Sequence, residues 1–172
     1  MNAPRMLVAG VGNVFLGDDG FGVEVACRLA RGPLPADVRV VDFGIRGIDL
    51  VYALLDPYDA VLLIDITRRG CAPGTLYVIE PTLVDGPAAP TDDLLASGHE
   101  LDPGRVLRLA RTLGADLRCV LLLGCEPAAF EGSDFGADGF SPHVAAAVDQ
   151  AVALARSLIE DLRQRGTEHG RA

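Results

Sequence analysis

The stretch Ala60-Val61-Leu62-Leu63-Ile64-Asp65 decides the fold class, because it is a continuous apolar run that ends in an acidic residue. A run of this kind is typical of a strand that is buried on both faces of a parallel sheet. Outward from it, similar short apolar runs occur at residues 6–10 and 119–123. The sequence therefore predicts a mainly parallel sheet that is covered on both of its faces.

Strands and helices are expected to alternate along the rest of the chain. Apolar periodicity and turn signals at Gly and Pro predict the remaining elements, which are strands at 38–41 and 75–79 and helices at 21–30, 48–55, 101–113 and from 142 onward. Ser141 and Pro142 suit the N-cap and the first residue of the last helix, and the tail 164–172 is expected to be frayed. We predict a single α/β domain over residues 1–172. It is a three-layer sandwich with a twisted five-stranded sheet and helices on both faces.

The composition excludes several classes of function. All 15 basic residues of the 172 are Arg, so chemistry that needs a lysine, such as a Walker-type phosphate site or a Schiff base, is excluded. The net charge of −9 argues against nucleic acid as a partner, and no apolar run is long enough to span a membrane. The four cysteines show no C-x-x-C pair, so we interpret them as reduced thiols in a cytoplasmic protein.

Acidic residues follow several of the predicted strands, at the sheet edge where ligands bind in this class of fold. Asp65 ends the buried run, Asp42 follows the second strand, and Asp19 lies in the loop after the first. His99 precedes the predicted helix at 101–113 and is expected at the same edge. Asp19, Asp65 and His99 together offer two oxygens and one nitrogen, which suits zinc or nickel with positions left open. The alternatives are a solvated acidic cap at Asp18 and Asp19, and a role as a helix cap or a surface residue for His99.

The glycines of the first loop also suggest a dinucleotide site. Gly10, Gly12 and Asp42 would then serve an NAD(P)-dependent oxidoreductase. Phe15 occupies the place of the third glycine, however, and the acids at Asp18-Asp19 would repel a pyrophosphate. Cys125 could act as a nucleophile, but a thiol at the end of a buried strand is more often an inert core residue.

Six blocks of the sequence, spread over residues 6 to about 160, carry a family resemblance. They are Gly10-Val11-Gly12-Asn13 with Gly17-Asp18-Asp19-Gly20-Phe21-Gly22, Val41-Asp42-Phe43-Gly44, Leu63-Ile64-Asp65, Ala72-Pro73-Gly74-Thr75, His99-Glu100-Leu101, and Gly124-Cys125-Glu126-Pro127 with Phe140-Ser141-Pro142. In this order, they resemble the nickel-iron hydrogenase maturation proteases.

The resemblance implies an endopeptidase that removes the C-terminal peptide of a hydrogenase large-subunit precursor once nickel has been inserted. It implies that Asp19, Asp65 and His99 are the metal-binding positions, that the nickel is carried by the substrate, and that zinc or cadmium can substitute in the isolated protein. Asp42 is a candidate for contact with the substrate. We expect a cytoplasmic monomer with no nucleic-acid or membrane partner. A nickel-dependent hydrogenase chaperone without proteolytic activity is a further alternative.

Overall fold

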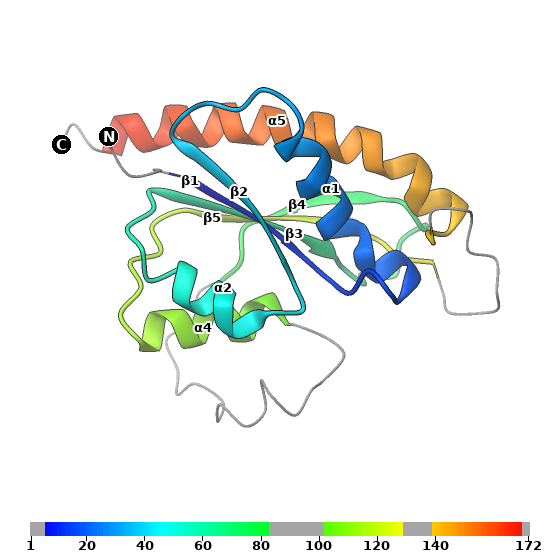
Figure 1. Cartoon of the computed structure of the whole chain (residues 1–172), viewed down its shortest axis with the longest axis horizontal. Helices are drawn as coiled ribbons and strands as arrows, with labels where there is room; N and C mark the ends of the chain where they lie inside the picture. Colours follow the sequence, from blue (N-terminus) through cyan, green and yellow to red (C-terminus); the bar gives the residue numbers. More distant parts are fainter. Residues whose placement is uncertain (1–5, 83–101, 129–138, 170–172) are drawn as a thin grey trace.

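A computed structural model describes residues 6–82, 102–128 and 139–169, and its centre is a twisted five-stranded sheet (Figure 1). The strand order is β2-β1-β3-β5-β4. The strands are β1 (Met6–Val11), β2 (Val38–Gly44), β3 (Ala60–Ile66), β4 (Leu76–Ile79) and β5 (Val120–Cys125). Only β4 at one edge runs antiparallel to its neighbour, so the prediction of a five-stranded, mainly parallel sheet is confirmed.

Helices cover both faces of this sheet. In Figure 1, α1 (Phe21–Ala30) and α5 (Pro142–His169) lie above it, and α2 (Gly47–Ala53) and α4 (Pro103–Thr112) lie below it. A short 3-10 helix, η1 (Gly17–Gly20), leads directly into α1. The three-layer α/β sandwich predicted from the sequence is therefore confirmed. None of the described helices has the length and hydropathy that a bilayer span requires.

The core consists of two apolar clusters, one on each face of the sheet. The cluster between the sheet and helices α1 and α5 contains Met6, Val8, Leu62 and Ile64, and the cluster between the sheet and helices α2 and α4 contains Leu7, Ala9, Val61 and Leu63. Successive side chains of a strand point to opposite faces, so β1 and β3 supply both clusters. This double burial explains why their sequences read as continuous apolar runs rather than as alternating ones.

The last helix is longer than the sequence suggested. We expected fraying from residue 164, but α5 continues as a helix to His169. Near this end Leu162 is buried, and the Arg163 guanidinium lies 2.9 Å from the carboxylate of Asp37, the residue directly before β2. Apolar packing and this ion pair hold the helix at residues 162 and 163, next to the polar sequence that begins at 164.

Close packing at two glycines sets the position of α1. A β-carbon on Gly22 would lie 2.0 Å from the carbonyl oxygen of Ile64 and 2.3 Å from that of Val11. A β-carbon on Gly10 would lie 2.5 Å from the β-carbon of Ala26. The first turn of α1 therefore rests directly on the carboxyl ends of β1 and β3. This contact places η1, and with it Asp19, at the carboxyl edge of the sheet.

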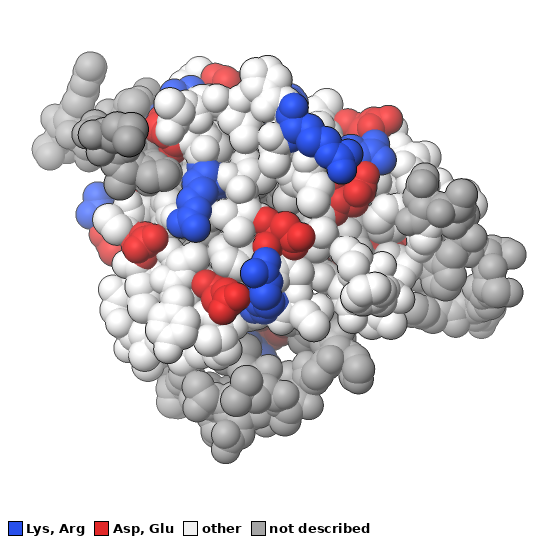
Figure 2. Space-filling model, in the orientation of Figure 1, with Lys and Arg blue, Asp and Glu red and all other residues white. Residues whose placement is uncertain are grey.

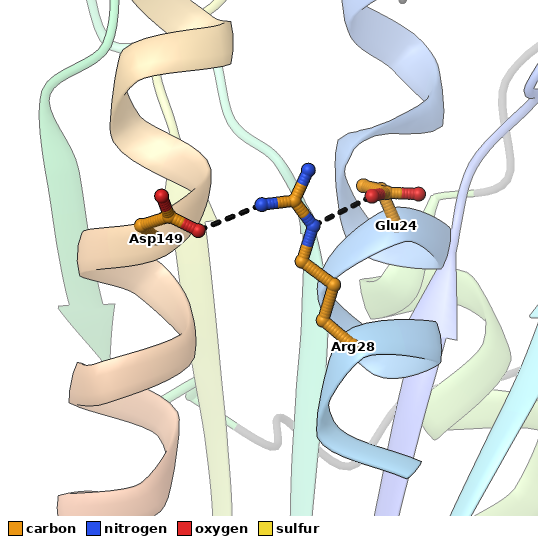
Figure 3. Close-up of polar contacts among 3 residues, drawn as sticks. All are labelled: Glu24, Arg28 and Asp149. Carbon is orange, nitrogen blue, oxygen red and sulfur yellow. Dashed lines mark hydrogen bonds and ion pairs between the residues drawn. The ribbon is translucent and has the colours of Figure 1, made fainter. Parts of the chain in front are cut away.

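An ion-pair bridge joins the two helices on the upper face (Figure 3). Arg28 on α1 contacts Glu24 at 2.6 Å and Asp149 on α5 at 2.7 Å. Because Arg28 and Glu24 are partly exposed and Asp149 is largely exposed, such pairs contribute only about 0–1 kcal/mol each. On the face in Figure 2, arginines generally lie beside acidic groups instead of gathering into a basic patch, as expected for a chain with net charge −9.

Candidate active site

The loop between β1 and η1 is organised by the side chains of Asn13 and Asp19. The Asn13 backbone N–H donates to Asp19 Oδ2 at 2.8 Å, and the Phe15 N–H donates to Asn13 Oδ1 at 3.0 Å. The Leu16 N–H donates to the Asn13 carbonyl at 3.1 Å, and the Asp19 N–H donates to the Leu16 carbonyl at 3.3 Å. The loop is thus a closed turn with the Asp19 carboxylate at its base.

Asp19 and Asp65 meet at Gly12. Asp65 lies near the end of β3, is only 6% exposed, and accepts a hydrogen bond from the Ile66 N–H at Oδ1. A β-carbon on Gly12 would lie 1.8 Å from the Asp19 carbonyl oxygen and 3.8 Å from Asp65 Oδ1. The φ of Gly12 is +132°, so this position requires glycine on both steric and conformational grounds. The structure therefore places the Asp19 carbonyl and the Asp65 carboxylate next to Gly12, with the Asp19 carboxylate held at the neighbouring Asn13 N–H.

The third residue of the predicted trio, His99, lies outside the described residues. Within residues 6–82, 102–128 and 139–169, no three His, Cys, Asp or Glu side chains form a group that could hold a metal ion. The metal site made by Asp19, Asp65 and His99 therefore stays a prediction.

Asp42 lies at the same edge, one strand further out. It pairs in register with Gly10, so β1 separates it from Asp65 on β3. Its side chain is exposed on the α1 side of the sheet, where its negative charge contributes, after burial, to a raised pKa of the Cys27 thiol. Its role as a substrate contact remains a prediction.

Asp18 has a structural role that the sequence did not reveal. Its carboxylate is buried and accepts three hydrogen bonds, from the Ala128 N–H at 2.9 Å, the Ser141 N–H at 2.7 Å and the Ser141 hydroxyl at 2.9 Å. The interpretation of Asp18 as part of a solvated cap is therefore wrong. Asp18 joins the segment after β5 to the start of α5, directly beside Asp19. The same contacts hold Ser141 at the N-terminus of α5, where the sequence placed it.

Glu126 is a third buried acid at this edge, after Asp65 and Asp18. It accepts hydrogen bonds from the Tyr77 hydroxyl at 2.6 Å and from the N–H groups of Arg69 at 2.8 Å and Gly70 at 3.1 Å. The Tyr77 hydrogen bond is the largest cause of a lowered pKa of Glu126; burial opposes it, and the backbone donors add to it. Glu126 thus fixes the loop between β3 and β4. Its place directly after a buried strand is the signal that could have identified it.

The lowered pKa of Glu126 predicts a pH-dependent loss of stability. A carboxyl group whose folded pKa is depressed stabilises the protein above its unfolded pKa, and this contribution is lost as the pH falls through the folded value. We expect Glu126→Gln to lower the melting temperature at pH 7, with a difference from the wild type that shrinks below about pH 4.3, the unperturbed value for Glu. Thermal melts of both proteins across this range measure it. A pH-independent difference would contradict the argument.

A family model described as "Hydrogenase maturation protease" matches residues 23–158. The chain belongs to this family. Among relatives of this maturation protease, the hydrogenase expression/formation protein HupD of Rhodobacter capsulatus is 34% identical over 165 residues, 95% of this chain and 74% of HupD. The hydrogenase 2 maturation protease of Escherichia coli K12 is 30% identical over 165 residues, 95% of this chain and 94% of the relative.

Solved structures with the same fold include further members of the family. The hydrogenase maturating endopeptidase HybD from Escherichia coli superimposes with a TM-score of 0.68 at 25% identity, covering 94% of each chain. The hydrogenase 2 maturation peptidase from a Thaumarchaeota archaeon gives a TM-score of 0.63 at 31% identity, covering 91% of this chain and 98% of the other. The protein is therefore an endopeptidase, a hydrolase of peptide bonds, and not an NAD(P)-dependent oxidoreductase. The family resemblance deduced from the sequence motifs is confirmed.

Cys125 lies at the same edge of this maturation protease but does not fit a nucleophile. Its side chain is fully buried at the end of β5. Burial, followed by the charges of Asp18 and Glu126, raises the pKa of its thiol to about 12. The thiol is therefore protonated at neutral pH, and only a thiolate is an effective nucleophile. The interpretation of Cys125 as a core residue is confirmed, and its raised pKa argues against a nucleophilic role.

Proposed function

We propose that this protease removes the C-terminal peptide of a nickel-iron hydrogenase large-subunit precursor after nickel has been inserted. The observation that carries the proposal is the convergence of Asp19 and Asp65 on Gly12, at the edge of the sheet where this class of fold binds ligands. Family membership supplies the class of reaction. The names of the relatives, among them the hydrogenase 2 maturation protease of Escherichia coli, point to the class of substrate.

In this proposal, Asp19, Asp65 and His99 recognise the nickel that the precursor carries. Two carboxylates and one imidazole make an incomplete ligand set for nickel, which leaves positions for ligands from the precursor itself. A carboxylate as buried as that of Asp65 attracts a nearby cation more strongly than an exposed one would, because charges interact more strongly away from water. Recognition would then depend on the metal as well as on the polypeptide, so that an unloaded precursor is left uncut.

Hydrolysis forms a bond between a water oxygen and the scissile carbonyl carbon, breaks the carbon–nitrogen bond, and delivers a proton to the leaving nitrogen. The carboxylate of Asp19 or Asp65 can accept a proton from the attacking water as a general base. Polarisation of the scissile carbonyl by the substrate's metal is the second way to lower the barrier. Both place the reacting bond beside Gly12.

The four cysteines support a cytoplasmic location for this reaction. Cys27, Cys71, Cys119 and Cys125 are all free thiols. Free cysteines of this kind are typical of proteins in a reducing compartment. We infer that the protease acts there, as a monomer.

The decisive test is the dependence of cleavage on nickel in the precursor. The purified protease is incubated with nickel-loaded precursor, with nickel-free precursor, and with nickel-free precursor plus zinc, and the masses of the products are measured. We expect the nickel-loaded precursor alone to be shortened, because the metal belongs to the substrate. Cleavage of the nickel-free precursor after addition of zinc would mean an ordinary catalytic zinc centre and would refute nickel recognition. Binding of the loaded precursor without shortening would favour the chaperone alternative.

A further inference from the structure

Four apolar side chains are exposed on two neighbouring loops at the carboxyl edge of the sheet. Val14, Phe15 and Leu16 form the outer part of the loop before η1, and Phe15 is 91% exposed. Ile45, 62% exposed, lies in the loop after β2. The two loops are neighbours, because the Gly12 N–H donates to the Gly44 carbonyl at 3.0 Å. We call these four residues the apolar rim.

Hydrogen bonds and packing fix the loop that carries Phe15, so the exposure of its apolar side chains is part of the folded structure. Phe15 is fixed by the hydrogen bond from its own N–H to Asn13 Oδ1, and the loop is closed at its base by the Asp19 carboxylate. Behind the loop, the Cα of Val14 lies 3.0 Å from the position of a β-carbon on Gly20, and Phe140 lies 3.6 Å from that position. An exposed aromatic side chain on a fixed loop loses little conformational entropy when a partner covers it.

We propose that the apolar rim binds an apolar segment of the large-subunit precursor next to the scissile bond. This inference rests on the proposed function, because it takes Asp19 and Asp65 as the cleavage site. Asp19 closes the same loop that carries Phe15, so the rim and the cleavage site are continuous. A strand-like segment advances about 3.3 Å per residue, and a polypeptide at the site therefore reaches the rim within a few residues.

The charges near the apolar rim favour an uncharged partner over an anionic one. The edge carries the carboxylates of Asp19, Asp42 and Asp65, which repel an anionic ligand. Arg46 follows Ile45, but its guanidinium donates to the carbonyl oxygens of Asp42 and Phe43 and lies 3.7 Å from Asp49, so its charge is already engaged. An uncharged apolar segment is the occupant that suits the rim, with the cationic metal of the precursor facing the acids.

The test compares Phe15→Ser with a matched control, Leu113→Ser. Leu113 is 54% exposed and follows α4 at the opposite, amino end of the sheet. Steady-state cleavage of nickel-loaded precursor is measured for both variants and for Phe15→Leu. We expect Phe15→Ser to raise KM about tenfold or more with kcat within about twofold, as for loss of an aromatic anchor that binds substrate and transition state equally. Phe15→Leu should retain most of the affinity, and Leu113→Ser should match the wild type.

Failure of this proposal is separable from failure of the proposed function. If the wild type cleaves the precursor and Phe15→Ser has the same KM, the docking role is wrong while the function stands. If the wild type does not cleave, the binding affinities of the wild type and Phe15→Ser for nickel-loaded precursor are compared instead. A tenfold weaker affinity of Phe15→Ser supports docking at the apolar rim, and equal affinities refute it. Sedimentation of the free protein tests whether a second copy of this chain occupies the apolar rim. A wild-type dimer that Phe15→Ser dissociates would make the rim a contact between copies and overturn the proposal.

Discussion

Replacing Asp19 with asparagine is expected to lower kcat/KM for nickel-loaded precursor at least about 100-fold, the size typical of losing a general base or a metal ligand. Asparagine keeps an oxygen that can accept the Asn13 N–H, at present 2.8 Å from Asp19 Oδ2, so the loop before η1 should keep its shape. What the substitution removes is the negative charge. Cleavage followed by mass spectrometry, with circular dichroism and thermal melting beside it, measures both effects.

The same pattern is expected for the other two members of the trio. Asp65→Asn and His99→Ala should each abolish processing while the melting temperature stays near that of the wild type. Asp161→Asn is the matched control, because Asp161 is an exposed acid near the far end of α5. Normal cleavage by Asp19→Asn would exclude Asp19 from the reaction, and normal cleavage by His99→Ala would identify His99 as a surface residue.

Much of this fold could be predicted from sequence because its central strands are buried on both faces. A strand such as β3 has to be apolar at almost every position, which gives a strong local signal. The ends of helices and strands depend on tertiary contacts and are therefore harder to predict from the sequence. The second strand was expected to end at residue 41 because Asp42 interrupts the apolar run, yet β2 continues to Gly44. Asp42 is exposed at the edge, whereas the side chain of Phe43 is buried in the core between the sheet and α2.

The acidic residues of the site differ in how far away in the sequence their contact partners lie. The positions of Asp19 and Asp65 at the edge follow from their places in a loop and in a strand, which local patterns reveal. The role of Asp18 depends on partners 110 and 123 residues away in sequence, and no local pattern encodes such a contact. Two adjacent aspartates of identical chemistry therefore have different surroundings: Asp18 is enclosed by hydrogen-bond donors, and Asp19 lies beside Asp65 at Gly12.

Because Asp18 makes these long-range hydrogen bonds, we expect Asp18→Ala to lower stability and not only activity. The substitution leaves the N–H groups of Ala128 and Ser141 and the Ser141 hydroxyl, which now donate to one carboxylate, without that acceptor. Removing one partner from a buried, charge-assisted hydrogen-bond group costs about 3 kcal/mol or more. For a chain of this size, that corresponds to a fall in melting temperature of roughly 10 °C.

Urea denaturation of Asp18→Ala, Asp19→Asn and an Asp161→Ala control measures the contrast. We expect a large loss of unfolding free energy for Asp18→Ala and changes within about 0.5 kcal/mol for the exposed control. Asp18→Ala should also weaken cleavage under conditions where it remains folded, because the start of α5 and the segment after β5 are no longer tied to the loop of Asp19. If Asp18→Ala were as stable as the wild type, water would be replacing the carboxylate at these donors, and Asp18 would not be the link that holds this edge of the sheet together.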